Sequence, residues 1–87
     1  MATYIITAET TNAATYEKLY GAVKSYGTWA RITEWSWAVV SDKKSTEVRD
    51  HLEQYLARGD RLLVVRSGTE SAWGNVRCNS EWLQEHL

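Results

Sequence analysis

The chain of 87 residues contains no proline and no phenylalanine, and Cys78 is its single cysteine. A lone cysteine excludes an intrachain disulfide and a Cys-x-x-Cys metal pair, so we expect a reducing, cytoplasmic setting. No apolar run approaches the ~18 to 20 residues that span a bilayer. The opening residues, MATYIITAE, lack the basic and apolar regions of a secretory signal. The sequence therefore predicts a soluble protein with no membrane partner.

An excess of positive charge is also missing. The chain has 10 Lys and Arg against 11 Asp and Glu, which gives a formal net charge of −1. Proteins that bind long nucleic acid usually carry a basic excess, because affinity grows with the number of phosphates neutralised. A small anionic ligand or a protein partner therefore fits this balance at least as well as a duplex.

Hydrophobic periodicity predicts one domain, residues 1–87, with four strands, two longer helices and a short terminal helix. The predicted strands are Thr3 to Ala8, Thr28 to Thr33, Trp35 to Ser41 and Arg61 to Arg66. The predicted helices are about 13 to 26 with Asn12 or Thr11 as N-cap, a segment capped by Ser45 and ended by Gly59, and Ser80 to Leu87. Their order, β-α-β-β-α-β, is the α+β ferredoxin-like plan, with both longer helices on one face of an antiparallel sheet.

Alternation along the strands predicts that both faces of this sheet are apolar. Trp37 and Ala38 point to opposite faces in strand three, as do Leu62 and Leu63 in strand four. Two helices of this length cover only one face, which leaves the other bare. The sequence therefore predicts a twofold homodimer packed through the sheet, with higher assembly left open.

Three tryptophans fall within the stretch TWARITEWSWAVV at residues 28 to 40. Trp37 lies inside an apolar strand, so we expect it in the core or in a dimer interface. Trp29 and Trp35 lie at predicted strand ends, where a half-exposed ring can stack on a base. Trp73 lies beyond strand four, and we expect it to pack across the dimer or under the terminal helix.

Several blocks of the chain resemble the SinR-like branch of the CRISPR-associated Cas-two superfamily. The blocks are YIIT at 4 to 7, YEKLY at 16 to 20, KSYGTWA at 24 to 30, WAVVSDK at 37 to 43, RDHLEQYL at 49 to 56 and DRLLVV at 60 to 65. The resemblance covers about residue 3 to Trp73 and implies a ferredoxin-like homodimer. Members of the superfamily act as nucleases, as non-catalytic scaffolds or as toxin-like ribonucleases.

The resemblance also implies an aspartate at the end of strand one that holds a divalent metal. This chain has Ala8-Glu9 where the pattern has Tyr-Asp. The added methylene of glutamate displaces the carboxylate oxygens, which an octahedral Mg²⁺ or Mn²⁺ site tolerates poorly. A metal cofactor is therefore expected only if the protein is a nuclease, with Glu9 as its ligand.

The predicted topology brings charged and aromatic residues to the edge where strand one ends and helix one begins. The candidate ligand contacts are Glu9, Thr10, Asn12, Arg31, Trp35, Arg58 and Arg61, together with Trp29 at the opposite edge. Glu9 is either a ligand contact or a solvated residue capping helix one. The three arginines either clamp a phosphate bidentately or make surface ion pairs with Glu34 and Asp60.

Three functions are compatible with these features. The one we favour is a Cas-two-like dimer that binds a nucleotide or short nucleic acid without turnover. The mobile-element setting of the family suggests that such a dimer sequesters a nucleotide signal in the contest between phages and bacterial defence. The alternatives are a metal-dependent nuclease acting on RNA or DNA, and a non-catalytic protein-interaction scaffold.

Overall fold

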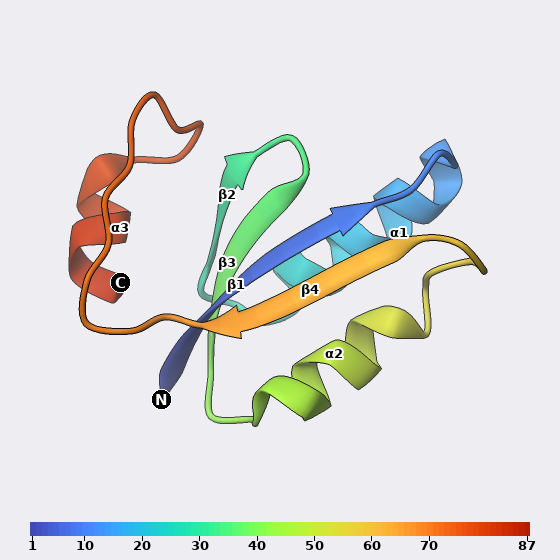
Figure 1. Ribbon diagram of the computed structural model, residues 1–87, viewed down its shortest axis with the longest axis horizontal. Coiled ribbons are helices and arrows are strands. Elements are labelled where there is room, and N and C mark those ends of the chain that lie inside the picture. The colour runs from blue at the N-terminus through green and yellow to red at the C-terminus, as the bar shows by residue number, and fades with distance from the viewer.

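Four strands form one antiparallel sheet, in the order β2-β3-β1-β4, in the computed structural model of residues 1–87 (Figure 1). The strands are β1 (Ala2–Glu9), β2 (Trp29–Thr33), β3 (Ser36–Ser41) and β4 (Arg61–Arg66). The helices are α1 (Ala13–Lys24), α2 (Ser45–Glu53) and α3 (Ser80–His86). This small α+β domain is consistent with the ferredoxin-like plan predicted from the sequence. None of its helices has the length and apolar content needed to cross a membrane.

Helix α1 begins as predicted, because Asn12 is its N-cap and the side-chain Oδ1 accepts a hydrogen bond of 3.0 Å from the backbone N–H of Thr15. It ends at Lys24, two residues earlier than predicted. Gly27 follows with a φ of 84°, the left-handed conformation that glycine adopts most easily.

The predicted limits of the second helix were wrong at both ends. Lys44 holds the N-cap position in place of Ser45, and the carboxylate of Glu47 accepts from the Lys44 backbone N–H at 3.0 Å. The helix ends at Glu53, well before Gly59. The carboxylate of Asp60 accepts from the backbone N–H of Ala57, which closes a separate turn that replaces further helix.

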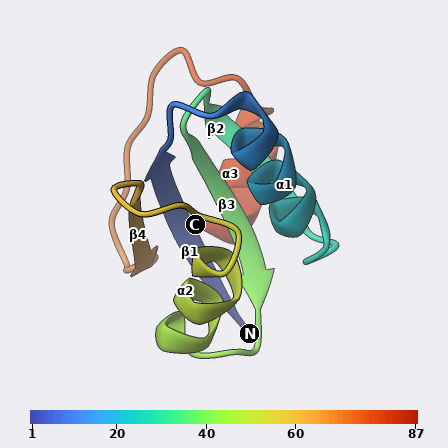
Figure 2. The ribbon, with the colours of Figure 1, turned by 90° about the vertical axis from the view of Figure 1, so that its right-hand side faces the viewer.

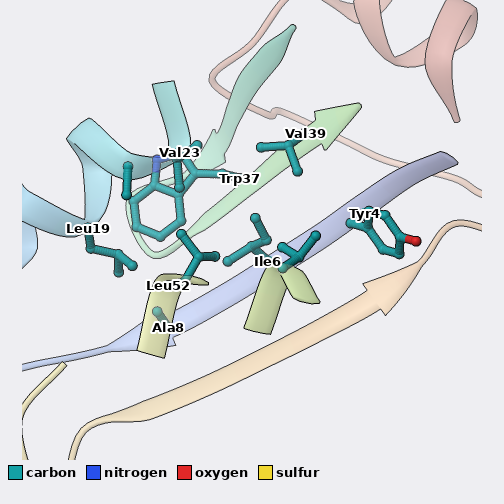
Figure 3. Close-up of a cluster of buried hydrophobic side chains, with 10 residues drawn as sticks. Tyr4, Ile6, Ala8, Leu19, Val23, Trp37, Val39 and Leu52 are labelled. Atoms are coloured by element: carbon teal, nitrogen blue, oxygen red, sulfur yellow. The ribbon is translucent and has the colours of Figure 1, made fainter. Parts of the chain in front are cut away.

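Helices α1 and α2 cover one face of the sheet, and the core lies between them and the strands (Figure 2). Tyr4 and Ile6 of β1 and Trp37 and Val39 of β3 point into this core (Figure 3). They meet side chains of the two helices, among them Leu19, Val23 and Leu52. Trp37 is 0% exposed, which confirms the prediction that it belongs to the core.

Helix α3 lies on the other face of the sheet, behind β2 and β3 in Figure 2. The hydroxyl of Thr3 donates to the backbone carbonyl of His86 at 2.6 Å, which ties α3 to β1. Ala38 on this face and Leu83 of α3 are both buried. The expectation that the chain leaves this face entirely bare was therefore wrong for the half made by β2 and β3.

The β4 side of the same face stays open. Leu63 and Val65 are 55% and 47% exposed, although Leu62 and Val64, which alternate with them, pack against the core. Alternation along β4 therefore predicted both sets of positions correctly, and an apolar patch of two large side chains remains uncovered.

Candidate functional site

The candidate residues lie near the end of the sheet where β1 finishes, but the structure distributes them among separate hollows. Thr10, Asn12 and Trp35 line one hollow of about 300 Å³. Glu9 and Arg61 line a second of about 320 Å³. Arg58 lines a third of about 470 Å³, and Arg31 lines none of them. The three arginines therefore do not form the single phosphate clamp expected from the topology.

The hollow beside Trp35 joins a tryptophan ring to polar groups. We call it the Trp35 hollow, and it is lined by Thr10, Thr11, Asn12, Ala13, Tyr16, Glu17, Glu34 and Trp35. These residues come from the loop between β1 and α1, the first turns of α1 and the turn between β2 and β3. The N-terminus of α1, with its partial positive charge, therefore borders the hollow.

Trp35 lies in the β2–β3 turn, one residue before the strand that the sequence predicted it to begin. Its backbone carbonyl accepts from the Ala8 N–H at 3.0 Å and from the Thr7 hydroxyl at 3.2 Å. Its own N–H donates to the Thr33 hydroxyl at 3.3 Å. The backbone of Trp35 is therefore held on both sides, while the residue is 37% exposed. Its ring also meets the Tyr16 ring edge to face, with ring centroids 5.1 Å apart, which restricts its orientation. A ring restricted in this way needs little ordering when a flat ligand stacks on it.

Thr10 and Asn12 are largely occupied by local structure. The side-chain Oγ1 of Thr10, a buried residue, accepts from the Asn12 backbone N–H at 3.2 Å. The Asn12 side-chain oxygen caps α1. These contacts shape the floor of the Trp35 hollow and leave the Asn12 amide N–H groups and the Thr10 hydroxyl proton as donors.

The charged residues of the Trp35 hollow are both acidic. Glu17 and Glu34 line it, and no lysine or arginine does. Carboxylates accept hydrogen bonds and do not donate them when ionised, so they complement N–H groups of a ligand better than a phosphate. The hollow is therefore suited to the amino edge of a nucleobase rather than to its phosphate.

Arg31 lies under α1 beside this hollow. Its Nη2 donates to the Tyr16 hydroxyl at 2.9 Å, and its guanidinium carbon lies 5.5 Å from the centre of the Tyr20 ring. Its Nε is buried and has no hydrogen-bond acceptor. The Tyr16 hydroxyl in turn donates to the backbone carbonyl of Glu34 at 2.7 Å. The expected ion pair between Arg31 and a carboxylate is absent, and a hydrogen-bonded chain through Tyr16 takes its place.

Glu9 and Arg61 form an exposed ion pair on the face of the sheet away from α1 and α2. They are directly paired residues of β1 and β4, and Arg61 Nη1 donates to Glu9 Oε1 at 2.7 Å. Glu9 thus neither caps α1 nor stands free, and Arg61 pairs with neither Glu34 nor Asp60. No cluster of three His, Cys, Asp or Glu side chains suited to a metal occurs in the chain. Since a guanidinium already holds the Glu9 carboxylate, the residues fit poorly the divalent metal that the sequence resemblance implies.

The remaining candidates lie apart from the Trp35 hollow. Arg58 lies in the turn before β4 and makes no ion pair, since the Asp60 carboxylate is used by the Ala57 N–H. Trp29, the first residue of β2, is half-buried, and its ring stands edge-on to Tyr20 with ring centroids 5.7 Å apart. It therefore contacts α1 rather than the hollow.

The predicted ligand contacts omit five of the eight residues that line this hollow, namely Thr11, Ala13, Tyr16, Glu17 and Glu34. Tyr16 recurs with Leu19 and Tyr20 at helical spacing, a pattern that indicates the apolar stripe of a helix and not a ligand contact. Its position one turn after the N-cap was the available signal, since that turn borders the β2–β3 turn in this topology.

No protein-family model matches this chain, and no curated protein matches it significantly.

Proposed function

We propose that this protein is a Cas-two-like homodimer that binds a nucleotide or short nucleic acid without cleaving it. The observation that carries this proposal is the partly exposed Trp35, which lines a hollow of about 300 Å³ and is positioned by its backbone hydrogen bonds and by the ring of Tyr16. Stacking of a base on such a ring contributes about 1 to 3 kcal/mol. The hollow therefore supplies both a stacking surface and polar groups beside it.

The acidic lining sets a preference among bases. The exocyclic amino groups of adenine, guanine and cytosine donate hydrogen bonds, and the carboxylates of Glu17 and Glu34 accept them. Uracil and thymine lack such an amino group. We therefore expect nucleotides of the first three bases to bind more tightly than uridine nucleotides.

The contacts of Glu9 favour binding over hydrolysis. In the nuclease alternative, two Glu9 carboxylates would hold a divalent cation, yet each carboxylate is within 2.7 Å of an arginine nitrogen. A cation placed there would face the positive charge of Arg61 at close range. Purified protein with Mn²⁺ should therefore leave labelled RNA and DNA intact, and cleavage that vanishes in Glu9→Ala would contradict the proposal.

A second copy of the chain is the occupant we propose for the apolar patch of Leu63 and Val65. Pairing through the open edge of β4 is disfavoured, because the symmetric antiparallel register would bring Arg61 opposite Arg66 of the other copy at both ends. Packing of one patch on the other, face to face, buries all four side chains without this repulsion. The resemblance to Cas-two-like proteins supports the same assembly, and a cytoplasmic role in sequestering a nucleotide signal.

Equilibrium dialysis with AMP, GMP, CMP and UMP tests the binding site. The native protein should bind the first three, and Trp35→Ala should weaken binding by about 5- to 150-fold, the loss of one stacking contact. Trp82→Ala, a half-buried tryptophan of α3 on the other side of the sheet, is the matched control and should bind normally. If no nucleotide binds, or if both variants weaken binding equally, the site is not at Trp35 and the scaffold alternative gains support.

A further inference from the structure

A row of four aromatic rings begins at the Trp35 hollow and joins α1 to the β2–β3 hairpin. The aromatic row consists of Trp35, Tyr16, Tyr20 and Trp29. Successive ring centroids are 5.1 Å, 6.2 Å and 5.7 Å apart, and each pair meets edge to face. Tyr16, Tyr20 and Trp29 are all half-buried, so part of each residue packs against the core and part is exposed to solvent.

Two cations lie against this row. The ammonium of Lys24 is 4.3 Å from the centre of the Tyr20 ring and 5.8 Å from that of Trp29. The guanidinium carbon of Arg31 is 5.5 Å from the centre of the same Tyr20 ring. Both charges therefore lie between the two tryptophans that end the row.

Neither cation is neutralised by the chain itself. The ion pairs of the structure join Arg49 to Asp50 and Glu53, and Arg61 to Glu9. Lys24 and Arg31 thus have aromatic neighbours but no carboxylate partner, and the Nε of Arg31 lacks any acceptor. Uncompensated positive charge between aromatic rings favours an anion that also carries flat groups.

Single-stranded nucleic acid has this combination, because its bases are free to stack and its phosphates alternate with them. A duplex does not, since its bases are stacked on one another and cannot reach the rings. We propose that the aromatic row binds a short single strand, with one base on Trp35, another on Trp29, and the phosphates between them facing Arg31 and Lys24. This inference rests on the proposed nucleotide site at Trp35 and extends it from one nucleotide to several.

Fluorescence anisotropy with labelled tetracytidylate, as RNA and as DNA, tests this inference against CMP as competitor. The tetranucleotide should bind at least about tenfold more tightly than CMP, and the two sugars should bind alike because stacking and charge do not read the 2′-hydroxyl. Trp29→Ala should weaken tetranucleotide binding about 5- to 150-fold and leave CMP binding unchanged. Lys24→Ala should reduce the slope of log affinity against log salt by about 0.7, the value for one phosphate contact on a single strand.

Lys18→Ala is the matched control, because Lys18 is an exposed lysine of the same helix outside the row. Lys24 is also exposed, so its substitution tests the proposal even if Trp29→Ala fails to fold. Binding of the tetranucleotide no tighter than CMP, or equal effects of Lys18→Ala and Lys24→Ala, would overturn the inference while leaving the nucleotide site intact. Failure of both CMP and the tetranucleotide to bind the native protein would instead overturn the proposed function.

Discussion

The indole of Trp35 stands edge-on to the phenol ring of Tyr16, with ring centroids 5.1 Å apart and ring planes at 78°. The Tyr16 hydroxyl donates to the carbonyl of Glu34 and accepts from Arg31. One side chain of α1 thus supports the ring that borders the proposed site and joins the helix to the β2–β3 turn. The orientation of Trp35 depends on Tyr16 as well as on its own backbone contacts.

Substitution of Tyr16 should separate these two contributions. Tyr16→Phe keeps the ring but loses both hydrogen bonds, so the free energy of unfolding should fall by about 2 kcal/mol, roughly 1 kcal/mol for each bond, as measured by urea denaturation. Tyr16→Ala removes the ring as well and should also make Trp35 more accessible to acrylamide quenching. Tyr55→Phe, in the turn after α2, is a control for loss of a phenol hydroxyl. Equal quenching in native protein and Tyr16→Ala would show that the backbone alone positions Trp35.

The contact between Thr3 and the end of α3 predicts how firmly this helix is docked. Thr3→Val keeps the shape of the side chain and removes the hydrogen bond to His86, so stability should fall by about 1 kcal/mol. Amide hydrogens of α3 should exchange faster, because the helix opens more often. Thr46→Val, at an exposed position of α2, should change neither property. Unchanged exchange around Leu83 in Thr3→Val would mean that apolar packing alone holds the helix.

The burial of Tyr26 predicts a loss of folding stability at high pH. Its hydroxyl is hydrogen-bonded to His51 Nδ1 at 2.8 Å, and burial raises the pKa of Tyr26 above the ordinary value of 10.0. The folded state therefore holds the proton more tightly than the unfolded state, and this contribution is fully present below pH ~10 and lost as the pH rises through the folded pKa. Urea unfolding between pH 8 and about 11.5 should show a decline that is weaker in Tyr26→Phe. A decline of the same size in both proteins would assign it to other groups.

The apolar patch on β4 predicts the oligomeric state. Sedimentation at low micromolar concentration should show a dimer of the 10.0 kDa chain, and Leu63→Glu should shift it to the monomer with an unchanged circular dichroism spectrum. Ala14→Glu introduces the same charge at an exposed position of α1, on the opposite face of the sheet, and should remain dimeric. A native protein that sediments as a monomer would contradict the proposed dimer.

Much of the fold follows from local patterns in the sequence. Alternation identifies every strand, and helical spacing identifies the two longer helices. The same patterns predict a buried position for Trp37, in the core or in a dimer interface, and the structure places it in the core. The docking of α3 does not follow in this way. It depends on contacts between residues far apart in the chain, such as Thr3 with His86 and the Arg77 N–H with the Ile32 carbonyl. A helix of seven residues gives too little pattern to indicate which face it covers.

Only part of the candidate site could be predicted from the sequence. Topology correctly brings the end of β1, the start of α1 and the β2–β3 turn to one end of the sheet. The topology alone does not give the face of the sheet on which each side chain lies. Glu9 and Arg61 pair on one face, whereas Arg31 is paired with Trp37 on the other face under α1. The sheet therefore separates Arg31 from Glu9 and Arg61, although the topology brings all three to the same edge. They cannot bind one ligand together.

The most direct test of the proposed site is a titration of the indole N–H signals of the five tryptophans by two-dimensional ¹H–¹⁵N NMR. The Trp35 signal is assigned by its loss in Trp35→Phe, and CMP is added to the native protein. We expect the Trp35 signal to shift in a saturable manner while the signals of Trp37, in the core, and Trp82, on α3, stay in place. A titration in which Trp35 does not move, or in which only Trp82 moves, would contradict the account.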